Sequence, residues 1–422
     1  MEYWFENPQV KTLIPLSISS ALKGLFTAFS VPRIFVGTNV MPTGPVLGPT
    51  TMHALAPRCP RRRALVVTDG FNRRYFPRVR DFLSTGQFSC RLWDQTQPEA
   101  PLENVAACAR ALADFQPDLV LALGGGSVMD LAKGAWLLYE RPDIEALALV
   151  SPRTPLGLRR KAMLAAVPTT SGTGSECTGT AVFTDTAAQR KIPVTHAELV
   201  PDVAILDPSL TLSVPPPLTA GTGLDVLAHA LDAVTTPGAN HYTLPLALRA
   251  LELVFTWLPR AFAHGDDREA RQGMMIAANL AGIAFGMSGC HLSHSLGHAL
   301  GAVFELHHGL AVGIALPYTT QFCARASDAH LAACRALDIP APTPEQGLAG
   351  LVAKVRGLLA ALEVPSSLEG LGIEQQRFED NLPRLVELAH GDISCLLSPR
   401  PVTAAQCERL LRHAYQGRDV DF

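Results

Sequence analysis

The sequence predicts an α/β domain with a doubly wound parallel sheet, followed by an all-α domain. Short apolar runs alternate with helical patterns through the first half of the chain. The segment DVAILDPSLTLSVPPPLTA interrupts this alternation, and long Ala/Leu-rich helical patterns with few strand signals dominate from about Leu218 onward. We therefore expect an N-terminal extension at 1–32, an α/β domain at 33–213 and a helical domain at 214–422, with Pro215 to Pro217 as a rigid, hinge-like connection.

Length and composition narrow the class of protein. The 422 residues, 48% hydrophobic and 17% charged, predict a large buried core divided between two domains. With 35 basic and 38 acidic residues the net charge is -3, which argues against nucleic acid or an anionic membrane as the main partner. The nine cysteines show no CxxC pairing and indicate a reducing, cytoplasmic location. Since no run of about twenty apolar residues occurs, no membrane span is expected.

Residues 1–32 do not resemble the start of a domain. MEYWFENPQVK precedes an apolar-rich run that lacks the basic start and cleavage site of a secretory signal. We expect this segment to pack on the body of the protein or on another subunit, with encapsulation or membrane-surface binding as alternatives.

Four apolar runs predict the strands of the sheet. IFVG at 34–37, ALVVTDG at 64–70, the run 119–123 and MLAAVPTT at 163–170 are continuous rather than alternating, as in strands buried on both faces. VAACARALADF at 105–115 has the helical spacing of a crossover segment between them.

Two small-residue turns follow predicted strands. LALGGGSVMDLAKG places three glycines before a helix expected to start near Val128, where free N–H groups would suit a pyrophosphate. PTTSGTGSE supplies hydroxyls at Thr169, Thr170, Ser171 and Thr173. Both turns lie at carboxyl ends of strands, where open α/β folds bind ligands. The pattern is not GxGxxG, however, and GGGS could be only a tight turn.

Asp69 closes the run ALVVTD and is a candidate for cofactor discrimination. A carboxylate at the end of this strand could accept hydrogen bonds from ribose hydroxyls and would repel a 2′-phosphate. The alternative is that Asp69 only caps the turn with Gly70, and Arg73 and Arg74 could offset the repulsion.

Histidines at helical spacing predict a metal site in the second half of the chain. Asp225 and His229 share a helix face in GLDVLAHALDA, and HLSHSLGHALGAVFELHHG aligns His291, His294 and His298 before His307 and His308. One carboxylate with several imidazoles suits zinc, iron(II), cobalt or nickel. Each histidine taken alone could instead be a satisfied core residue.

Five motifs closely resemble those of the iron-containing, or group III, alcohol dehydrogenases, which include microcompartment propanol and ethanol dehydrogenases and lactaldehyde reductase. They are GGGSVMDLAKG, PTTSGTGSE, LVPDVAILDP, TGLDVLAHALDA and HSLGHALGAVFELHHG, in the family's order and spacing. The resemblance runs from about Arg33 to the C-terminal region. It implies a dehydroquinate synthase-like architecture with one divalent metal, iron(II) ahead of zinc, in a cleft between the domains.

The resemblance also assigns individual residues. The metal ligands would be Asp225, His229, His294 and His308, with His298 beside the metal and nicotinamide as a proton-transfer residue. The cofactor-binding positions would be Asp69, Gly125, Gly126, Ser127, Val128, Met129, Thr169, Thr170, Thr173 and Lys191. Two departures stand out: Glu99 occupies a position where an Asn commonly approaches the adenosine ribose, and His307 replaces a proline before the last ligand.

The activity implied is an NAD-dependent dehydrogenase of a small alcohol or aldehyde, with NADP the less favoured cofactor. A homodimer or higher homo-oligomer in the cytoplasm, or in a bacterial microcompartment, is expected. One alternative is a dehydroquinate-synthase-like lyase, although few Lys or Arg lie near the histidines to bind a phosphorylated substrate. The other is a metal-dependent scaffold protein without enzymatic activity.

Overall fold

The computed structural model describes residues 30–38, 40–41, 49–147, 150–151, 155–188 and 190–422. The N-terminal extension predicted at 1–32 lies outside the described residues except for its last three positions. The described residues form two compact units, an α/β unit that ends at Ser213 and a helical unit that begins at Val214.

The α/β unit is built on a six-stranded sheet in which all neighbouring strands are parallel. The strand order is β1-β8-β5-β4-β2-β3, as expected for a doubly wound sheet. The strands are β1 (Arg33–Val36), β2 (Arg63–Val67), β3 (Ser89–Trp93), β4 (Leu119–Gly124), β5 (Met163–Pro168) and β8 (Val203–Leu206). The four strands predicted from apolar runs are confirmed. The prediction missed β3, whose polar residues break its apolar run, and β8, which has only four residues.

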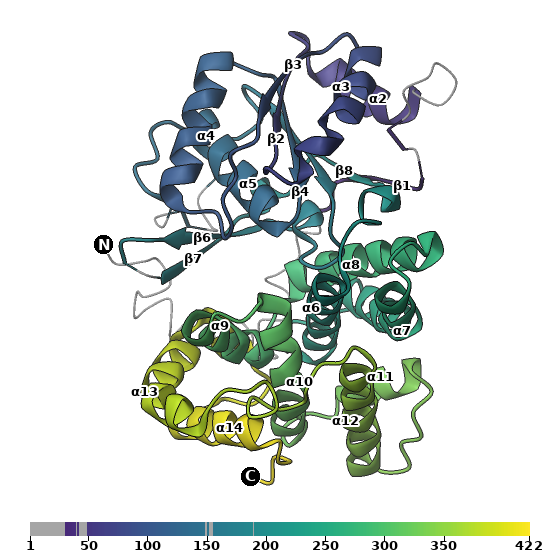
Figure 1. The fold of residues 1–422 in the computed structure, drawn as a ribbon, viewed down its shortest axis with the longest axis vertical. Coiled ribbons are helices and arrows are strands. Elements are labelled where there is room, and N and C mark those ends of the chain that lie inside the picture. Colours follow the sequence, from purple (N-terminus) through teal and green to yellow (C-terminus); the bar gives the residue numbers. More distant parts are fainter. Residues whose placement is uncertain (1–29, 39, 42–48, 148–149, 152–154, 189) are drawn as a thin grey trace. The chain divides into compact units, whose positions relative to one another are not determined.

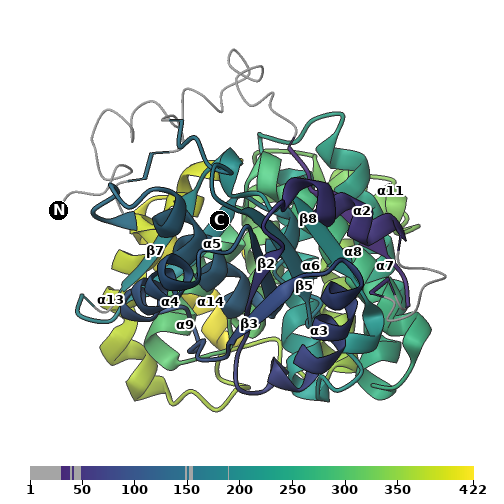
Figure 2. The same ribbon diagram turned by 90° about the horizontal axis from the view of Figure 1, so that it is seen from above.

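Helices cover both faces of this sheet (Figures 1 and 2). Strand residues alternate between the two layers: Leu65 and Val67 pack with α4 (Leu102–Phe115) and α5 (Gly126–Glu140). Ala64 and Val66 face the opposite layer, which contains α2 (Pro49–Leu55) and α3 (Phe76–Thr85). Because both faces are buried, the strands read as continuous apolar runs.

A separate antiparallel pair, β6 (Thr180–Asp185) with β7 (Arg190–Thr195), completes the strands of the described chain. Short 3-10 turns connect several elements: η2 (Ala56–Arg58), η3 (Asn72–Tyr75), η5 (Ser175–Cys177), η6 (Ala197–Leu199), η7 (Pro208–Leu210) and η8 (Ile393–Leu397).

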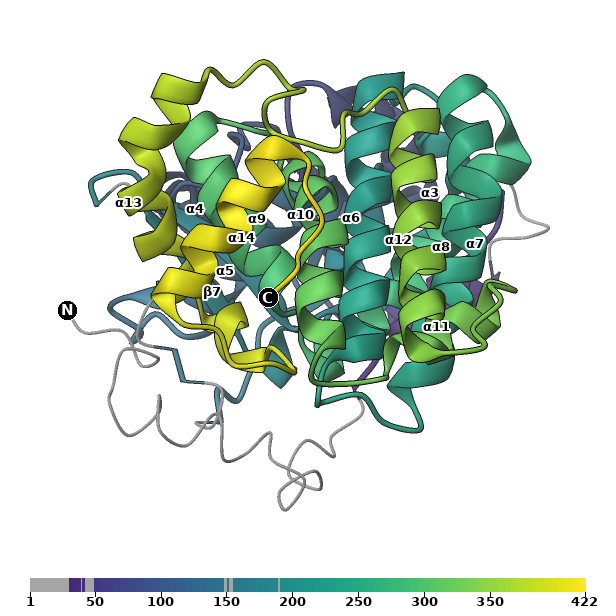
Figure 3. The same ribbon diagram turned by 90° about the horizontal axis from the view of Figure 1, so that it is seen from below.

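The helical unit contains two hydrophobic clusters that share α10 (Figure 3). Val312 and Leu316 of α10 belong to one cluster, and Ile314 and Tyr318 belong to the other, so this helix is apolar on nearly all sides. The helices are α6 (Pro216–Thr235), α7 (Thr243–Ala263), α8 (Arg268–Ser288), α9 (Leu292–Phe304), α10 (His308–Ala324), α11 (His330–Ala336), α12 (Pro344–Ala361), α13 (Gln375–Gly391) and α14 (Ala404–Gln416).

The proline segment predicted as a rigid connection lies directly after the boundary between the two units and also begins a helix. Pro215 is the N-cap of α6, and Pro216 and Pro217 form its first turn. Prolines fit there because the first helical residues need no intrahelical N–H donor and their φ is already helical. The prolines therefore start the helix that carries Asp225 and His229. The helix expected near Val128 likewise begins slightly earlier, at Gly126.

In the described part of the chain, no single helix is long and apolar enough to cross a membrane. Only the pair α8 and α9, bent by 106° at the break between them, passes such a test by length and composition.

Candidate functional site

Asp225 and His229 face each other within α6. Their side chains lie one helical turn apart on a buried face, and His229 Nε2 is 3.6 Å from Asp225 Oδ1. The His229 ring stacks on Phe285 of α8, with ring centroids 3.9 Å apart. The helical spacing predicted from the sequence therefore places a carboxylate and an imidazole against each other, and the stacking contact restricts the orientation of the imidazole.

His294 approaches the same oxygen from α9, with its Nε2 3.9 Å from Asp225 Oδ1. Its other ring nitrogen, Nδ1, lies 2.8 Å from Asp232 Oδ2, which also accepts hydrogen bonds from the Ser293 hydroxyl and the His291 amide. Burial alone would raise the pKa of Asp232, but His291 and His294 lower it overall, so the carboxylate is ionised. An ionised partner at Nδ1 fixes the tautomer and leaves Nε2 as an electron-pair donor.

Asp232 was missed in the sequence analysis, although it belongs to the motif TGLDVLAHALDA. It follows Asp225 by seven residues, which is two helical turns, and so lies on the same face of α6. That seven-residue spacing was the signal in the sequence that could have predicted a role for Asp232.

His308 completes the convergence from the first residue of α10. Its Nε2 is 3.3 Å from Asp225 Oδ1. The approach of α10 to α6 depends on Gly309, because a Cβ there would lie 1.9 Å from the Gly221 carbonyl oxygen. His307 has a different environment, since its ring packs against Gly221, where a Cβ would lie 2.6 Å from His307 Nδ1.

The donor geometry fits a divalent cation. Ligand atoms 2.0–2.3 Å from a tetrahedral ion lie about 3.3–3.8 Å apart. Two of the distances to Asp225 Oδ1, 3.3 and 3.6 Å, fall in this range, and the third, 3.9 Å, lies just above it. Asp225 Oδ1 and His294 Nε2 are also buried without a hydrogen-bond partner among the described residues, a costly arrangement that a bound cation would relieve.

The charge states of these residues favour the same conclusion. Burial lowers the pKa of His229 to about 3, opposed by the Asp225 charge, and burial also lowers the pKa of His308. For Asp225, burial raises the pKa, but the attraction of His229, His308 and His294 outweighs it and the net direction is downward. Asp225 is therefore ionised while His229 and His308 are neutral, which are the protonation states that bind metals.

His298 lies beside this cluster without belonging to either group of potential metal donors found in the described residues. Its ring stacks on His308 with centroids 5.2 Å apart, and its Nδ1 is 2.8 Å from Asp392 Oδ2. Burial opposes ionisation of Asp392, but His298 and hydrogen bonds from Ser394 bring the pKa down to about 2. Asp392 therefore holds the His298 ring through Nδ1.

His291, which shares the predicted helix face with His294 and His298, serves another purpose. It is the N-cap of α9, and its Nε2 is 2.7 Å from the Thr235 hydroxyl. It is absent from the potential metal-donor groups of the described chain.

In the α/β unit, the two small-residue turns lie against each other at the carboxyl edge of the sheet. Strands β4 and β5 are paired neighbours, and the Thr169 amide donates to the Gly124 carbonyl at 3.0 Å. A Cβ on Gly125 would lie 3.2 Å from Thr170 Oγ1, and one on Gly126 would lie 2.8 Å from Thr173 Cγ2. Glycine is therefore needed where the two turns meet.

The start of α5 offers backbone donors rather than side chains. The side chains of Val128 and Met129 are buried in the core, and their amides donate to the Gly125 carbonyl at 3.1 and 3.0 Å. Since those two amides are used, the amides of Gly126 and Ser127 are the donors that the first turn can direct at a ligand.

Asp69 caps the turn that follows β2. Its Oδ1 accepts from the amides of Phe71 and Asn72 at 2.8 and 2.7 Å, and its Oδ2 accepts from the Asn72 side chain at 2.8 Å. The capping role considered from the sequence is therefore present, and a carboxylate retains further lone pairs for a ribose hydroxyl.

The two arginines considered near Asp69 have other partners. Arg73 pairs with Asp94 at 3.3 Å, and the Arg74 guanidinium lies over the Phe71 ring.

Glu99 and Lys191, both connected with the cofactor by the sequence analysis, form an ion pair of 2.7 Å. Lys191 also donates to the Thr184 hydroxyl at 2.9 Å, and the Glu99 amide donates to Ser127 Oγ at 3.0 Å. The pair therefore joins β7 to the start of α5. Because the Lys191 charge is already compensated by Glu99, it is a weaker attractor for an additional phosphate.

Lys133 lies in the motif GGGSVMDLAKG, but the sequence did not indicate its structural role. It is 1% exposed, and its Nζ donates to Ser175 Oγ, the Thr178 carbonyl and the Thr180 carbonyl at 2.7–2.9 Å. Asp130 accepts from the same serine at 2.8 Å. Burial lowers the pKa of Lys133 to about 8 and raises that of Asp130, each opposed by the other's charge. Lys133 thus links α5 by hydrogen bonds to the segment between Ser175 and Thr180.

We expect Lys133→Ala to lower the free energy of unfolding by about 3–5 kcal/mol, because it leaves the buried Asp130 and two carbonyl groups without their cation. Lys133→Met is the matched control, since it keeps the aliphatic bulk and removes only the charge. The difference between the two variants therefore measures the part of the effect that comes from lost aliphatic packing. Denaturant unfolding followed by circular dichroism measures both. If Lys133→Ala unfolds like the wild type, the buried ammonium group does not stabilise this turn.

Comparison with known proteins gives consistent matches over both units. Residues 42–208 match the iron-containing alcohol dehydrogenase family, and residues 219–415 match the C-terminal part of the Fe-containing alcohol dehydrogenase family. An NADPH-dependent butanol dehydrogenase of Clostridium saccharobutylicum is 33% identical over 365 residues, covering 86% of this chain and 94% of that protein. The 1-propanol dehydrogenase PduQ of Citrobacter freundii is 33% identical, with 84% and 93% covered.

Solved structures agree with the sequence matches. An iron-containing alcohol dehydrogenase from Thermococcus thioreducens superposes with a TM-score of 0.81 at 27% identity, covering 92% of this chain and 99% of that one. The chain also matches an aldehyde-alcohol dehydrogenase of Streptococcus pneumoniae and the bifunctional aldehyde-alcohol dehydrogenase AdhE of Escherichia coli, of which it spans 40% and 43% of the length.

These likenesses agree on the class of protein, an oxidoreductase that interconverts alcohols and aldehydes with a nicotinamide cofactor. The chain belongs to the iron-containing alcohol dehydrogenase family. The expectation of a dehydrogenase is thereby confirmed over the lyase and scaffold alternatives, and the predicted fold class is confirmed as well.

Proposed function

We propose that Asp225, His229, His294 and His308 hold one divalent cation, iron(II) ahead of zinc, next to which a small alcohol is oxidised or an aldehyde is reduced. The observation that carries this proposal is the convergence of three imidazole Nε2 atoms within 3.9 Å of a single oxygen, Asp225 Oδ1. When bound, the cation supplies a Lewis acid that polarises the carbon–oxygen bond of the substrate.

His298 is proposed to handle the proton of the reaction. Alcohol oxidation sends a hydride to C4 of the nicotinamide and releases a proton from the hydroxyl group. With Nδ1 held by Asp392, His298 would take that proton at Nε2. Its side chain is 34% exposed, so the proton can pass from the ring to solvent.

The cofactor is proposed to bind at the carboxyl edge of the parallel sheet. The amides of Gly126 and Ser127 would bind the pyrophosphate, because a helix N-terminus carries partial positive charge and free N–H donors. The remaining proposed contacts are Gly125, Thr169, Thr170, Thr173, Lys191 and Asp69, with Val128 and Met129 contributing to the backbone of the same turn.

An alcohol and aldehyde panel combined with metal analysis tests the proposed function. We expect about one divalent ion per chain and cofactor-dependent turnover of at least one short alcohol or aldehyde. Turnover with NADH or NADPH that persists after complete removal of the metal would contradict the proposed role of the four residues.

We further propose that NAD(H) is preferred over NADP(H), because the carboxylate of Asp69 would oppose a 2′-phosphate. In Asp69→Asn the remaining amide oxygen can still accept the two backbone capping hydrogen bonds at Oδ1, so this variant removes the charge and the Asn72 side-chain hydrogen bond but keeps the backbone cap. We expect its ratio of kcat/KM for the two cofactors to move by about tenfold toward NADP(H). Asp69→Gly removes both charge and cap.

Steady-state kinetics with both cofactors measures this ratio. A wild-type preference for NADP(H), or an unchanged ratio in both variants, would remove Asp69 from cofactor discrimination. The homo-oligomeric assembly and the cytoplasmic or microcompartment location expected from the sequence stay predictions.

A further inference from the structure

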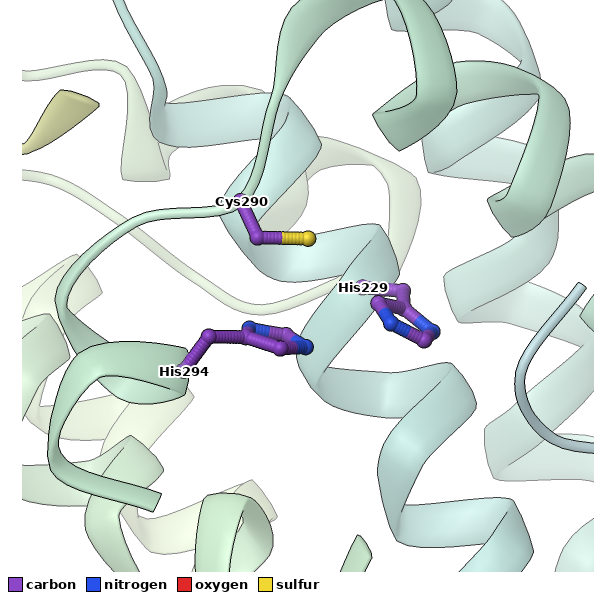
Figure 4. A group of neighbouring side chains, drawn as sticks. All are labelled: His229, Cys290 and His294. Carbon is purple, nitrogen blue, oxygen red and sulfur yellow. The ribbon is translucent and has the colours of Figure 1, made fainter. Parts of the chain in front are cut away.

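Cys290 brings a sulfur atom to the proposed metal site. It lies in the break between α8 and α9, and its Sγ and one ring nitrogen each of His229 and His294 all lie within 4.8 Å of one another. Figure 4 shows the thiol directed toward the two rings rather than away from them. Sulfur, imidazole nitrogen and carboxylate oxygen are the three donor types that zinc and cobalt accept together.

The backbone on both sides holds Cys290 in this position. Gly289 has a φ of +84°, and a Cβ there would lie 2.5 Å from Leu397 Cδ1, so the turn requires glycine. On the other side, the His291 amide donates to Asp232 Oδ2 at 3.0 Å, and the His291 ring bonds Thr235. The residues before and after the thiol are therefore fixed by contacts that do not involve it.

A second observation points to a ligand at this place. His294 Nε2 is buried and has no hydrogen-bond partner among the described residues, while Asp232 holds the opposite ring nitrogen. His294 also belongs to both potential donor groups, the one with Cys290 and the one with Asp225 and His308. The two groups share this imidazole, and His229 Nε2 of the first group lies 3.6 Å from Asp225 Oδ1 of the second, which favours one cation position over two.

We propose that Cys290 is a fifth donor of this metal site, giving the cation a sulfur ligand beside one carboxylate and three imidazoles. This inference rests on the metal site of the proposed function. On binding, the S–H bond of Cys290 breaks, a sulfur–metal bond forms and the proton leaves to solvent, without any change of oxidation state. The added thiolate compensates the remaining positive charge and, as a soft donor, gives the site a higher affinity for zinc and cobalt than the other four donors would give alone.

Cobalt(II) tests this proposal because its spectrum separates binding from sulfur ligation. We expect metal-free protein loaded with one Co²⁺ per chain to show visible ligand-field bands together with a near-ultraviolet sulfur-to-cobalt charge-transfer band. Cys290→Ser and Cys290→Ala should keep the ligand-field bands and lose the charge-transfer band. We also expect their Zn²⁺ affinity to fall by at least about tenfold.

Cys323→Ser is the matched control, since Cys323 is a buried cysteine of the same unit whose Sγ lies 3.5 Å from Ser398 Oγ. Its charge-transfer band should be unchanged. Stoichiometric Co²⁺ binding without a charge-transfer band in the wild type, or a band that survives in Cys290→Ala, would overturn the sulfur ligand while leaving the other four donors in place. Failure of the wild type to bind Co²⁺ would overturn both this inference and the proposed metal site.

Discussion

Asp225→Ala is expected to lose bound metal and turnover together. Asp225 Oδ1 is the one oxygen that His229, His294 and His308 all face, at 3.6, 3.9 and 3.3 Å. The carboxylate is also the only negative charge among the four proposed ligands, so its loss removes both a donor atom and most of the attraction for a cation. We expect metal affinity to fall by more than about 100-fold, beyond the usual effect of a supporting residue.

His307→Ala provides the matched control for this experiment. His307 directly precedes His308, but its ring packs against Gly221 instead of facing Asp225 Oδ1. We expect this variant to keep its metal, whereas His308→Ala should lose it. Elemental analysis of each purified variant, with turnover measured on the same sample, gives the answer. Retention of metal in His308→Ala with loss in His307→Ala would move the last ligand by one residue.

The proposed metal ligands show which part of a site can be predicted from a sequence. Asp225 and His229 could be paired in advance because positions four apart on a helix share a face. The choice between His307 and His308 could not be made from spacing, since the two residues mark the boundary between a loop and α10. The structure distinguishes them because Gly309 allows α10 to approach Gly221 closely, which brings His308 toward Asp225.

The hydrogen bonds that hold the functional side chains and turns in place were the part of the site that the sequence predicted least. Asp392 bonds His298 across 94 residues, and Lys133 reaches Ser175 across 42 residues, so no local pattern joins either pair. Asp69 shows a different limit, because here a local pattern is present but allows two roles. The sequence favoured a cofactor contact, which stays a prediction, and the structure shows that the same carboxylate also caps the turn after β2.

The fold could be predicted more completely than the site, because buried parallel strands are continuous apolar runs and long helices repeat their pattern over many residues. The sequence did not reveal that the segment PPP also begins a helix. A proline run can be a rigid linker or the first turn of a helix, and only the residues that follow it decide. Here Pro216 and Pro217 are the first residues of a helix of twenty residues, α6, whose packing stabilises this first turn.

His298→Ala is expected to keep the metal and bind the nicotinamide cofactor, yet to lose turnover by about 10²–10⁴-fold, the usual contribution of a positioned proton-transfer group. The His298 ring lies beside His308 but outside both potential donor groups of the described chain, so its removal should leave the cation in place. Metal analysis and cofactor titration on the variant, combined with its kcat, measure these effects separately.

Added imidazole separates proton transfer from a structural role of the same residue. If His298 carries the proton, free imidazole should restore part of the turnover in His298→Ala, because it can occupy the vacated space and titrates near neutrality. Asp392→Asn should show a smaller loss that imidazole does not rescue, since His298 is still present and only its hydrogen-bond partner at 2.8 Å is weakened. Loss of metal in His298→Ala would make His298 a ligand, and full turnover without imidazole would exclude it from the proton path.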